Sequence, residues 1–157
     1  MRRMDIDLRP ALPEDIADCV DLRGRTRENA VPAERLAALG ITVASWSGQV
    51  RRGELIGQVA WAGELMAGYA FGDVASGEVV VLALLPAFEG RGLGRRLLQR
   101  LVADLQARGH RRLFLGCGSD PALRSHGFYR HLGWRPTGRR DRFGDEELEL
   151  LPYATAP

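Results

Sequence analysis

The chain has 157 residues, of which 45% are hydrophobic and 27% are charged, a size and balance that suit one globular domain with its own core. Its net charge of +2 is too small to indicate a nucleic-acid or membrane partner by bulk electrostatics. No apolar stretch approaches the roughly 20 residues of a membrane span, and the first residues lack the apolar core of a secretory leader, so we expect a cytoplasmic protein.

Three short elements are expected in the first forty residues. A strand over Asp5–Arg9 comes first, and a helix over Glu14–Arg23 follows it. A second helix, around Ala33–Leu39, should end at Gly40, because glycine is typical of the position after a helix. The polar residues between the two helices show no periodicity, which predicts a loop.

Three strands are expected next. Glu54–Ala62 and Leu65–Asp73 flank Gly63-Glu64, a two-residue loop of the kind that suits a type II′ hairpin. Glu78–Leu85 is almost entirely apolar, and such a run predicts a central strand that is covered on both faces.

A glycine-rich turn and a long helix follow that strand. Gly90, Gly92 and Gly94 stand at alternating positions. The apolar residues after them recur at helical spacing: Leu93, Leu97, Leu98, Leu101, Val102 and Leu105. Because the first amides of a helix lack partners within the helix, and glycines allow a ligand to approach closely, this stretch predicts an anion-binding turn.

Arginines crowd the start of the same helix. Arg91, Arg95 and Arg96 place positive charge where the helix dipole disfavours it by about 0.3–1 kcal/mol each, which favours an anionic ligand at the turn. The alternative is a solvated basic face. Nucleotide motifs do not fit, since the chain has no lysine for a P-loop and the third glycine of a dinucleotide turn is replaced by Arg95 or Leu97.

The last third of the chain predicts three more strands. Arg111–Cys117 should lie parallel to Glu78–Leu85, because the long helix returns the chain to its starting edge. Trp134–Arg140 and Glu146–Leu151 should pair as antiparallel strands around a charged turn. Before them, Asp120 is expected to cap a helix with Pro121 as its first residue.

Two stretches resemble the GNAT superfamily of N-acetyltransferases. The acyl-CoA signature of that family is Gln/Arg-x-x-Gly-x-Gly/Ala, and its glycines match Gly92 and Gly94, while Glu89 stands where the family has Gln or Arg. The segment His126–Trp134 is similar to the helix and strand that carry the family's catalytic tyrosine. The two motifs together are specific for this superfamily, whereas either motif alone would only suggest it.

The resemblance extends over nearly the whole chain and implies a fold. The expected order of elements is β-α-α-β-β-β-α-β-α-β-β. It implies an α/β (α+β) domain over residues 1–157, with residues 153–157 as a frayed tail. The sheet would be mixed, mostly antiparallel, covered by helices on both faces, and split between the fourth and fifth strands.

The resemblance also implies acetyl-CoA as the acetyl donor. Its diphosphate would contact the glycine-rich turn, and its pantetheine arm would pair with the backbone of the fourth strand. The residues expected to bind it are Leu82, Leu84, Glu89, Gly90, Arg91, Gly92, Leu93, Gly94 and Arg95.

Two residues are candidates for the chemistry. Tyr129 matches the family's tyrosine, and a phenol with a pKa near 10 can protonate a leaving thiolate whose thiol has a pKa near 8.5. The alternative for Tyr129 is a core aromatic. Glu78, at the start of the fourth strand, is a candidate base that would act through waters or a bulge, and a surface acid is the equal alternative.

Acceptor contacts are implied for the region after the first helix. Arg27, Glu28 and Asn29 are candidate contacts, and Trp46 is a candidate aromatic wall. The alternatives are a solvated loop and a core tryptophan. No metal site is expected, because the two cysteines and three histidines share no ligand spacing.

The sequence therefore predicts an N-acetyltransferase that moves an acetyl group from acetyl-CoA to a primary amine by direct attack. The acceptor would be a small-molecule or peptide amine, and a homodimer is possible. The alternative is a non-catalytic acyl-CoA-binding sensor or interaction domain. A nucleic-acid module is disfavoured, because the basic residues are not interleaved with aromatic ones and the net charge is small.

Overall fold

The computed structural model describes residues 5–28 and 30–152. The strands are β1 (Asp7–Pro10), β2 (Leu55–Ala62), β3 (Leu65–Asp73), β4 (Val79–Leu84), β5 (Leu113–Cys117), β6 (Arg135–Arg140) and β7 (Glu146–Leu150). The helices are α1 (Ile16–Arg23), α2 (Ala33–Ala38), α3 (Val43–Arg51), α4 (Leu93–Ala107) and α5 (Arg124–His131). Asn29 and the predicted tail 153–157 lie outside the described residues.

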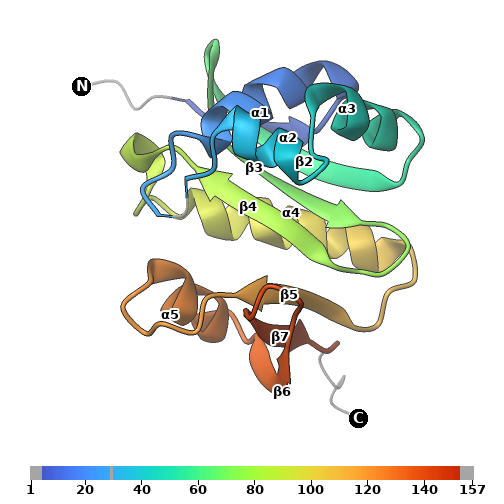
Figure 1. Cartoon of the computed structure of the whole chain (residues 1–157), viewed down its shortest axis with the longest axis vertical. Coiled ribbons are helices and arrows are strands. Elements are labelled where there is room, and N and C mark those ends of the chain that lie inside the picture. The colour runs from blue at the N-terminus through green and yellow to red at the C-terminus, as the bar shows by residue number, and fades with distance from the viewer. Residues whose placement is uncertain (1–4, 29, 153–157) are drawn as a thin grey trace.

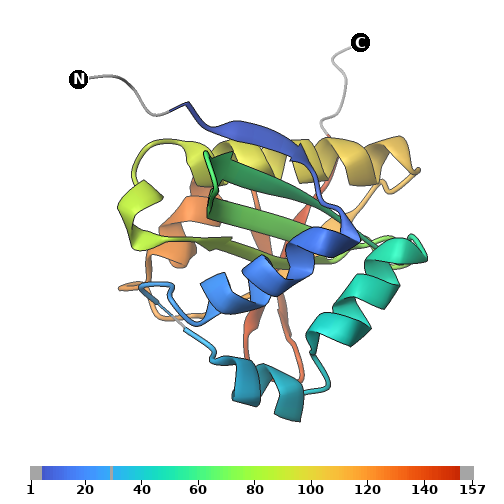
Figure 2. The same ribbon diagram turned by 90° about the horizontal axis from the view of Figure 1, so that it is seen from above.

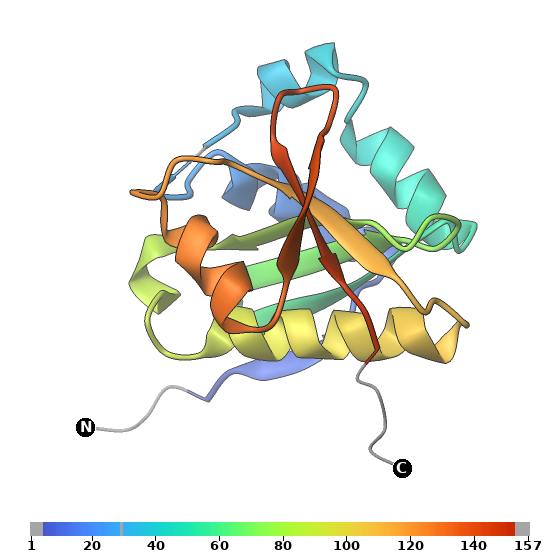
Figure 3. The same ribbon diagram turned by 90° about the horizontal axis from the view of Figure 1, so that it is seen from below.

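The strands form two antiparallel sheets that meet at one point. The first sheet has the order β1-β2-β3-β4 and the second the order β5-β7-β6. Glu78, just before β4, forms a parallel bridge with Phe114 of β5, which confirms that these strands are parallel neighbours. Figure 1 and Figure 3 show β4 and β5 running apart from this end. The predicted mixed sheet with a split between the fourth and fifth strands is therefore present.

Helix α4 covers one face of the first sheet (Figure 2). Its leucines pack on β3 where that strand carries Gly68 and Gly72: an added Cβ at Gly72 would lie 2.9 Å from Leu105 Cδ1, and one at Gly68 would lie 3.1 Å from Leu97 Cδ1. The glycines therefore let the helix approach the sheet closely. Leu97, Leu101 and Leu105 are fully buried there, as the helical spacing predicts.

The opposite face of the sheet is covered by α1 and α3 (Figure 2). Tyr69 and Phe71 of β3 point to this side, because side chains alternate along a strand, and they join Ile16 and Trp46 in a second core. The rings of Trp46 and Phe71 meet edge to face with centroids 5.4 Å apart. The expected hairpin is also present, since Ala62 pairs with Leu65 across a two-residue loop.

Helix α3 is not among the predicted elements. It carries few apolar residues, so the helical periodicity of its hydrophobic residues is weak. Its N-terminus, however, has a capping motif that the sequence contains. The side chain of Thr42 accepts a hydrogen bond from Ser45 N at 3.0 Å, and Ser45 Oγ accepts one from Thr42 N at 2.9 Å. This reciprocal pair is a capping box in which serine replaces the usual Glu or Gln.

Two further predictions need correction. Helix α5 begins at Arg124, and not at Pro121 as the Asp120 cap suggested. Asp120 Oδ1 accepts from Ala122 N at 2.9 Å and closes a turn ahead of the helix. The expectation that both faces of β4 are covered is wrong at Val80, because this residue is 41% exposed. Val80 is the extra residue of a bulge in β4, and it lines an open cavity.

Among the described residues, none of the helices combines the length and apolar character that a membrane crossing requires. 

Candidate active site

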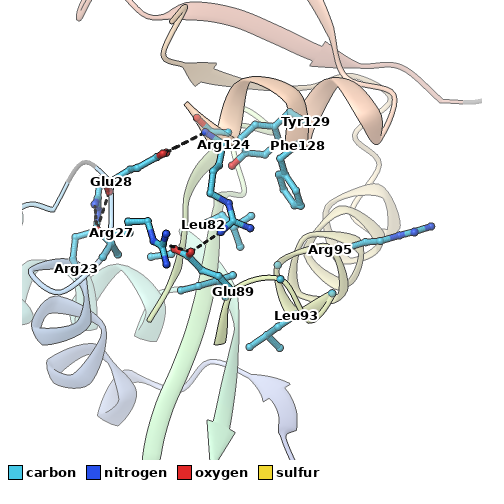
Figure 4. Close-up of a pocket in the computed structure, with 17 residues that line it drawn as sticks. Arg23, Arg27, Glu28, Leu82, Glu89, Leu93, Arg95, Arg124, Phe128 and Tyr129 are labelled. Carbon is cyan, nitrogen blue, oxygen red and sulfur yellow. Dashed lines mark hydrogen bonds and ion pairs between the residues drawn. The ribbon is translucent and has the colours of Figure 1, made fainter. Parts of the chain in front are cut away.

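A cavity of about 410 Å³ opens between the end of β4, the start of α4 and helix α5. Figure 4 shows the residues that line it. Most of the predicted donor-site residues contribute to its walls: Leu82, Leu84, Glu89, Gly90, Gly92, Leu93, Gly94 and Arg95. Tyr129 also lines this cavity. The structure therefore brings the glycine-rich turn and the candidate general acid to one place.

The glycine-rich turn leaves the start of α4 open. Gly90 and Gly92 have φ values of 74° and 78°, a left-handed conformation that favours glycine. An added Cβ at either position would meet no heavy atom within 4 Å. No side chain caps the helix, and the first turn carries no acidic residue. The amides of that turn are therefore left for a ligand or solvent.

Two arginines outside the turn reach into the cavity. Arg27 Nε lies 3.1 Å from Glu89 Oε2, and Arg124 Nη1 lies 2.6 Å from the same oxygen. The backbone amide of Arg124 donates to Glu28 Oε2 at 3.2 Å. These contacts join the loop after α1, the loop before α4, and the start of α5 across the cavity (Figure 4).

The arginines of the turn itself behave differently. The Arg91 guanidinium lies over the Phe88 ring at 5.8 Å, and Arg91 is absent from the described residues that line the cavity. Arg95 extends away from the other labelled side chains in Figure 4. Arg23, Arg27 and Arg124 therefore add positive charge to the cavity from outside the turn, although Glu89 offsets part of it.

Helix α5 positions Tyr129 between two aromatic rings. Its centroid lies 5.1 Å from that of Phe128 and 6.1 Å from that of Trp134. Burial raises the pKa of the Tyr129 phenol, and Cys117 adds a smaller effect in the same direction. The phenol is therefore neutral and carries its proton at ordinary pH.

A second cavity, of about 500 Å³, follows the first half of β4. It is lined by Glu78, Val79, Val80 and Val81, and by Trp46 from α3. Arg23 lines both cavities, so the two spaces lie one after the other along β4. Burial raises the pKa of Glu78, and the nearby negative charges of Asp73 and Asp141 raise it further.

A bulge in β4 lies within the part of the strand that lines the second cavity. Phe71 of β3 pairs with Val81, but the next residue, Gly72, pairs with Val79, so Val80 is the extra residue. A bulge bends a strand and changes the direction of its side chains. It also shortens the path along the strand between Glu78 and Leu82 relative to a regular strand.

The predicted acceptor residues are divided between the two cavities. Arg27 and Glu28 line the first cavity, whereas Trp46 lines the second. Trp46 is also a core residue, with 8% of its surface exposed. Asn29 lies outside the described residues. Sequence reasoning missed Arg124, because the expected helix start at Pro121 placed it inside a helix instead of at its first residue.

Within residues 5–28 and 30–152, no three histidine, cysteine or carboxylate side chains gather in a way that suits a metal ion. 

The split sheet and the open helix start define an α/β protein with a cavity beside the start of α4. A family model described as the acetyltransferase (GNAT) family matches residues 18–134. The chain therefore belongs to the GNAT family, as the resemblance of its motifs implied.

Known relatives agree with this membership. Mycothiol acetyltransferase of Beutenbergia cavernae is 39% identical over 72 residues, which is 46% of this chain and 24% of that protein. The match thus spans about a quarter of the relative's length.

Solved structures share the fold. PaiA N-acetyltransferase of Thermoplasma acidophilum, in complex with coenzyme A, superposes with a TM-score of 0.71 at 15% identity and covers 95% of this chain and 100% of that one. YncA of Salmonella typhimurium, solved with its cofactor acetyl-CoA, has a TM-score of 0.69 at 21% identity and covers 98% of each chain.

Proposed function

We propose that this chain is an N-acetyltransferase that uses acetyl-CoA to acetylate a primary amine. One observation carries the proposal: the uncapped start of α4 and the phenol of Tyr129 line the same cavity. Such an arrangement suits a ligand with a diphosphate at one end and a reactive thioester at the other. The GNAT family membership supports this reading of the cavity.

The residues present fit coenzyme A. The positive φ of Gly90 and Gly92, with open space at each Cβ, suits the close approach of a diphosphate to backbone amides. Arg27 and Arg124 add two guanidinium groups, which suit bidentate contacts to phosphate. Leu82 and Leu84 belong to the edge of β4 that β5 leaves free, so their backbone groups are suited to bind an extended pantetheine arm.

The bound donor supplies an acetyl thioester. Tyr129 then acts as the general acid and protonates the sulfur that leaves as the acceptor nitrogen attacks the carbonyl carbon. Its raised pKa keeps the phenol protonated before transfer. Glu78 accepts the proton of the acceptor amine, and burial suits it to this role because it raises the pKa of the carboxyl group towards neutrality.

The proposal is tested by measuring thiol release from acetyl-CoA over a panel of amines. Amino acids, polyamines, aminoglycosides and short peptides with free N-termini should be included. We expect at least one class to give turnover that saturates with both substrates. If coenzyme A binds in a calorimetric titration but no amine gives thiol release, the chain is instead a non-catalytic acyl-CoA-binding domain.

A further inference from the structure

The second cavity has an acidic end. Glu78 lines it from the start of β4, and Asp141 and Asp145 line it from the loop between β6 and β7. The two aspartates lie against Gly116 of β5, where an added Cβ would lie 3.5 Å from Asp145 Cβ and would contact Asp141 Oδ2. Three carboxylates from two segments of the chain, the start of β4 and the loop between β6 and β7, therefore converge here.

These carboxylates differ in what they already bind. Asp141 Oδ1 accepts hydrogen bonds from the amides of Phe143 and Asp145, both at 2.9 Å, and so holds the loop in shape. Within the described part of the chain, the carboxylates of Glu78 and Asp145 form neither hydrogen bonds nor ion pairs. Burial raises the pKa of Asp145, with Asp141 adding to the effect, as it does for Glu78.

A buried hydroxyl group lies towards the other end of the cavity. Tyr69 is 1% exposed and lines the cavity from β3, where it pairs with Ala83 of β4. Ala83 itself lines the first cavity. The hydrogen bonds of the described residues include none to the Tyr69 hydroxyl, and this oxygen is not among their fully enclosed polar atoms without a partner, so it is accessible from the cavity. This hydroxyl therefore indicates a polar ligand independently of the acids.

The cations near this cavity offset the acidic end only in part: the charge of Arg142 lowers the pKa of Glu78, but burial and the neighbouring carboxylates leave this pKa raised. Arg142 is exposed and stacks on the ring of Phe143, with 4.8 Å to the centroid. Arg23 lies at the boundary between the cavities and contacts Thr26 Oγ1 at 3.4 Å. Between the two ends the walls are apolar, and they include Leu36, Trp46 and Val81.

We propose that the second cavity binds an aliphatic diamine, with one nitrogen near Tyr69 and the second, charged nitrogen at Asp145. This inference rests on the proposed acetyl transfer and names its acceptor class. The nearer amine lies beside the first cavity and is the one acetylated. Its free base attacks the thioester carbon, the carbon–sulfur bond breaks, Tyr129 protonates the sulfur, and the proton that the nitrogen loses passes through waters to Glu78 at the acidic end. The distal ammonium stays bound to Asp145, and the apolar walls contact the methylene chain.

The test compares acceptors that differ only in the second charge. Thiol release from acetyl-CoA is measured with 1,6-diaminohexane and with hexylamine, and the ratio of the two kcat/KM values is taken. We expect the diamine to be favoured by about tenfold or more, the size of one charge-assisted hydrogen bond. The Asp145→Asn variant should lower this ratio at least severalfold. Asp145 is chosen over Asp141 because Asp141 also holds the loop.

Glu64→Gln is the matched control, because Glu64 is an exposed acid in the turn between β2 and β3 and should leave the ratio unchanged. A ratio near one, or a ratio that Asp145→Asn does not change, overturns the inference.

If coenzyme A binds but no amine is acetylated, the proposed function fails and the diamine is titrated calorimetrically into the coenzyme A-saturated chain. Binding that Asp145→Asn weakens supports the diamine site, and the absence of binding overturns it.

Discussion

The variants Gly92→Asp and Gly92→Asn differ in side-chain charge but hardly in side-chain shape. Comparing them therefore tests the effect of a negative charge at the start of α4. Gly92 has φ 78° and ψ 5°, and Asp and Asn visit this left-handed region more readily than other residues do. An added Cβ would meet no heavy atom within 4 Å. Both variants should therefore fold, at a cost of roughly 1–2 kcal/mol in unfolding free energy. The aspartate recovers about 0.3–1 kcal/mol of this from the helix dipole.

The two variants should differ in how they bind coenzyme A. A carboxylate about 5 Å from one phosphate charge is repelled by about 0.8 kcal/mol at a dielectric constant of about 80, and by about 3 kcal/mol at about 20. The dissociation constant of Gly92→Asp should thus exceed that of Gly92→Asn by roughly 4- to 160-fold. Calorimetric titration with coenzyme A measures both values. Equal dissociation constants for the two variants, with circular dichroism showing both folded, would refute the diphosphate site at this turn.

Three other variants test the chemistry and the fold. Tyr129→Phe should lower kcat by about 100-fold and leave the dissociation constant of coenzyme A unchanged, so retained turnover would remove Tyr129 from the mechanism. Because burial raises the pKa of Glu78, the acid limb of the kcat/KM–pH profile should lie above that of an ordinary carboxyl group. It should flatten in Glu78→Gln, and an identical profile for the two proteins would exclude Glu78 as the base. Asp15→Asn should cost about 1–3 kcal/mol of unfolding free energy at pH 7, because Asp15 is 4% exposed and accepts two hydrogen bonds from Arg9, each of 2.7 Å. Burial alone would raise the pKa of Asp15, but the bonds from Arg9 and Leu12 N outweigh it and the pKa is lowered. The stabilisation is therefore present above the unfolded-state pKa of about 4 and is lost as the pH falls through the lower folded-state pKa. Urea unfolding at several pH values measures this, and a difference from wild type that does not shrink in acid would contradict it.

Local signals explain what the sequence predicts well. The start of α4 follows from glycine spacing and from leucines at helical positions, both of which depend only on residues close in the chain. The hairpin of β2 and β3 follows from a two-residue loop in the same way. The sequence also predicts that Gly92 and Tyr129 contribute to one site, because each residue belongs to a motif that resembles the family's.

The rest depends on contacts between distant segments. Arg124 and Glu89 are separated by 35 positions, and the Arg124 amide and Glu28 by 96, so no local pattern links them. The division of the acceptor residues between two cavities depends on where the segment after α1 and helix α3 lie against β4, which is a matter of tertiary packing. The bulge at Val80 is likewise set by the pairing of β4 with β3, and an unbroken apolar run gives no sign of it.

A crystal structure of the chain with coenzyme A bound tests the central claim most directly. The account predicts that diphosphate oxygens accept hydrogen bonds from the amides at the start of α4, and that the sulfur lies beside the Tyr129 hydroxyl. Coenzyme A bound away from this turn, or with its sulfur remote from Tyr129, would contradict the account.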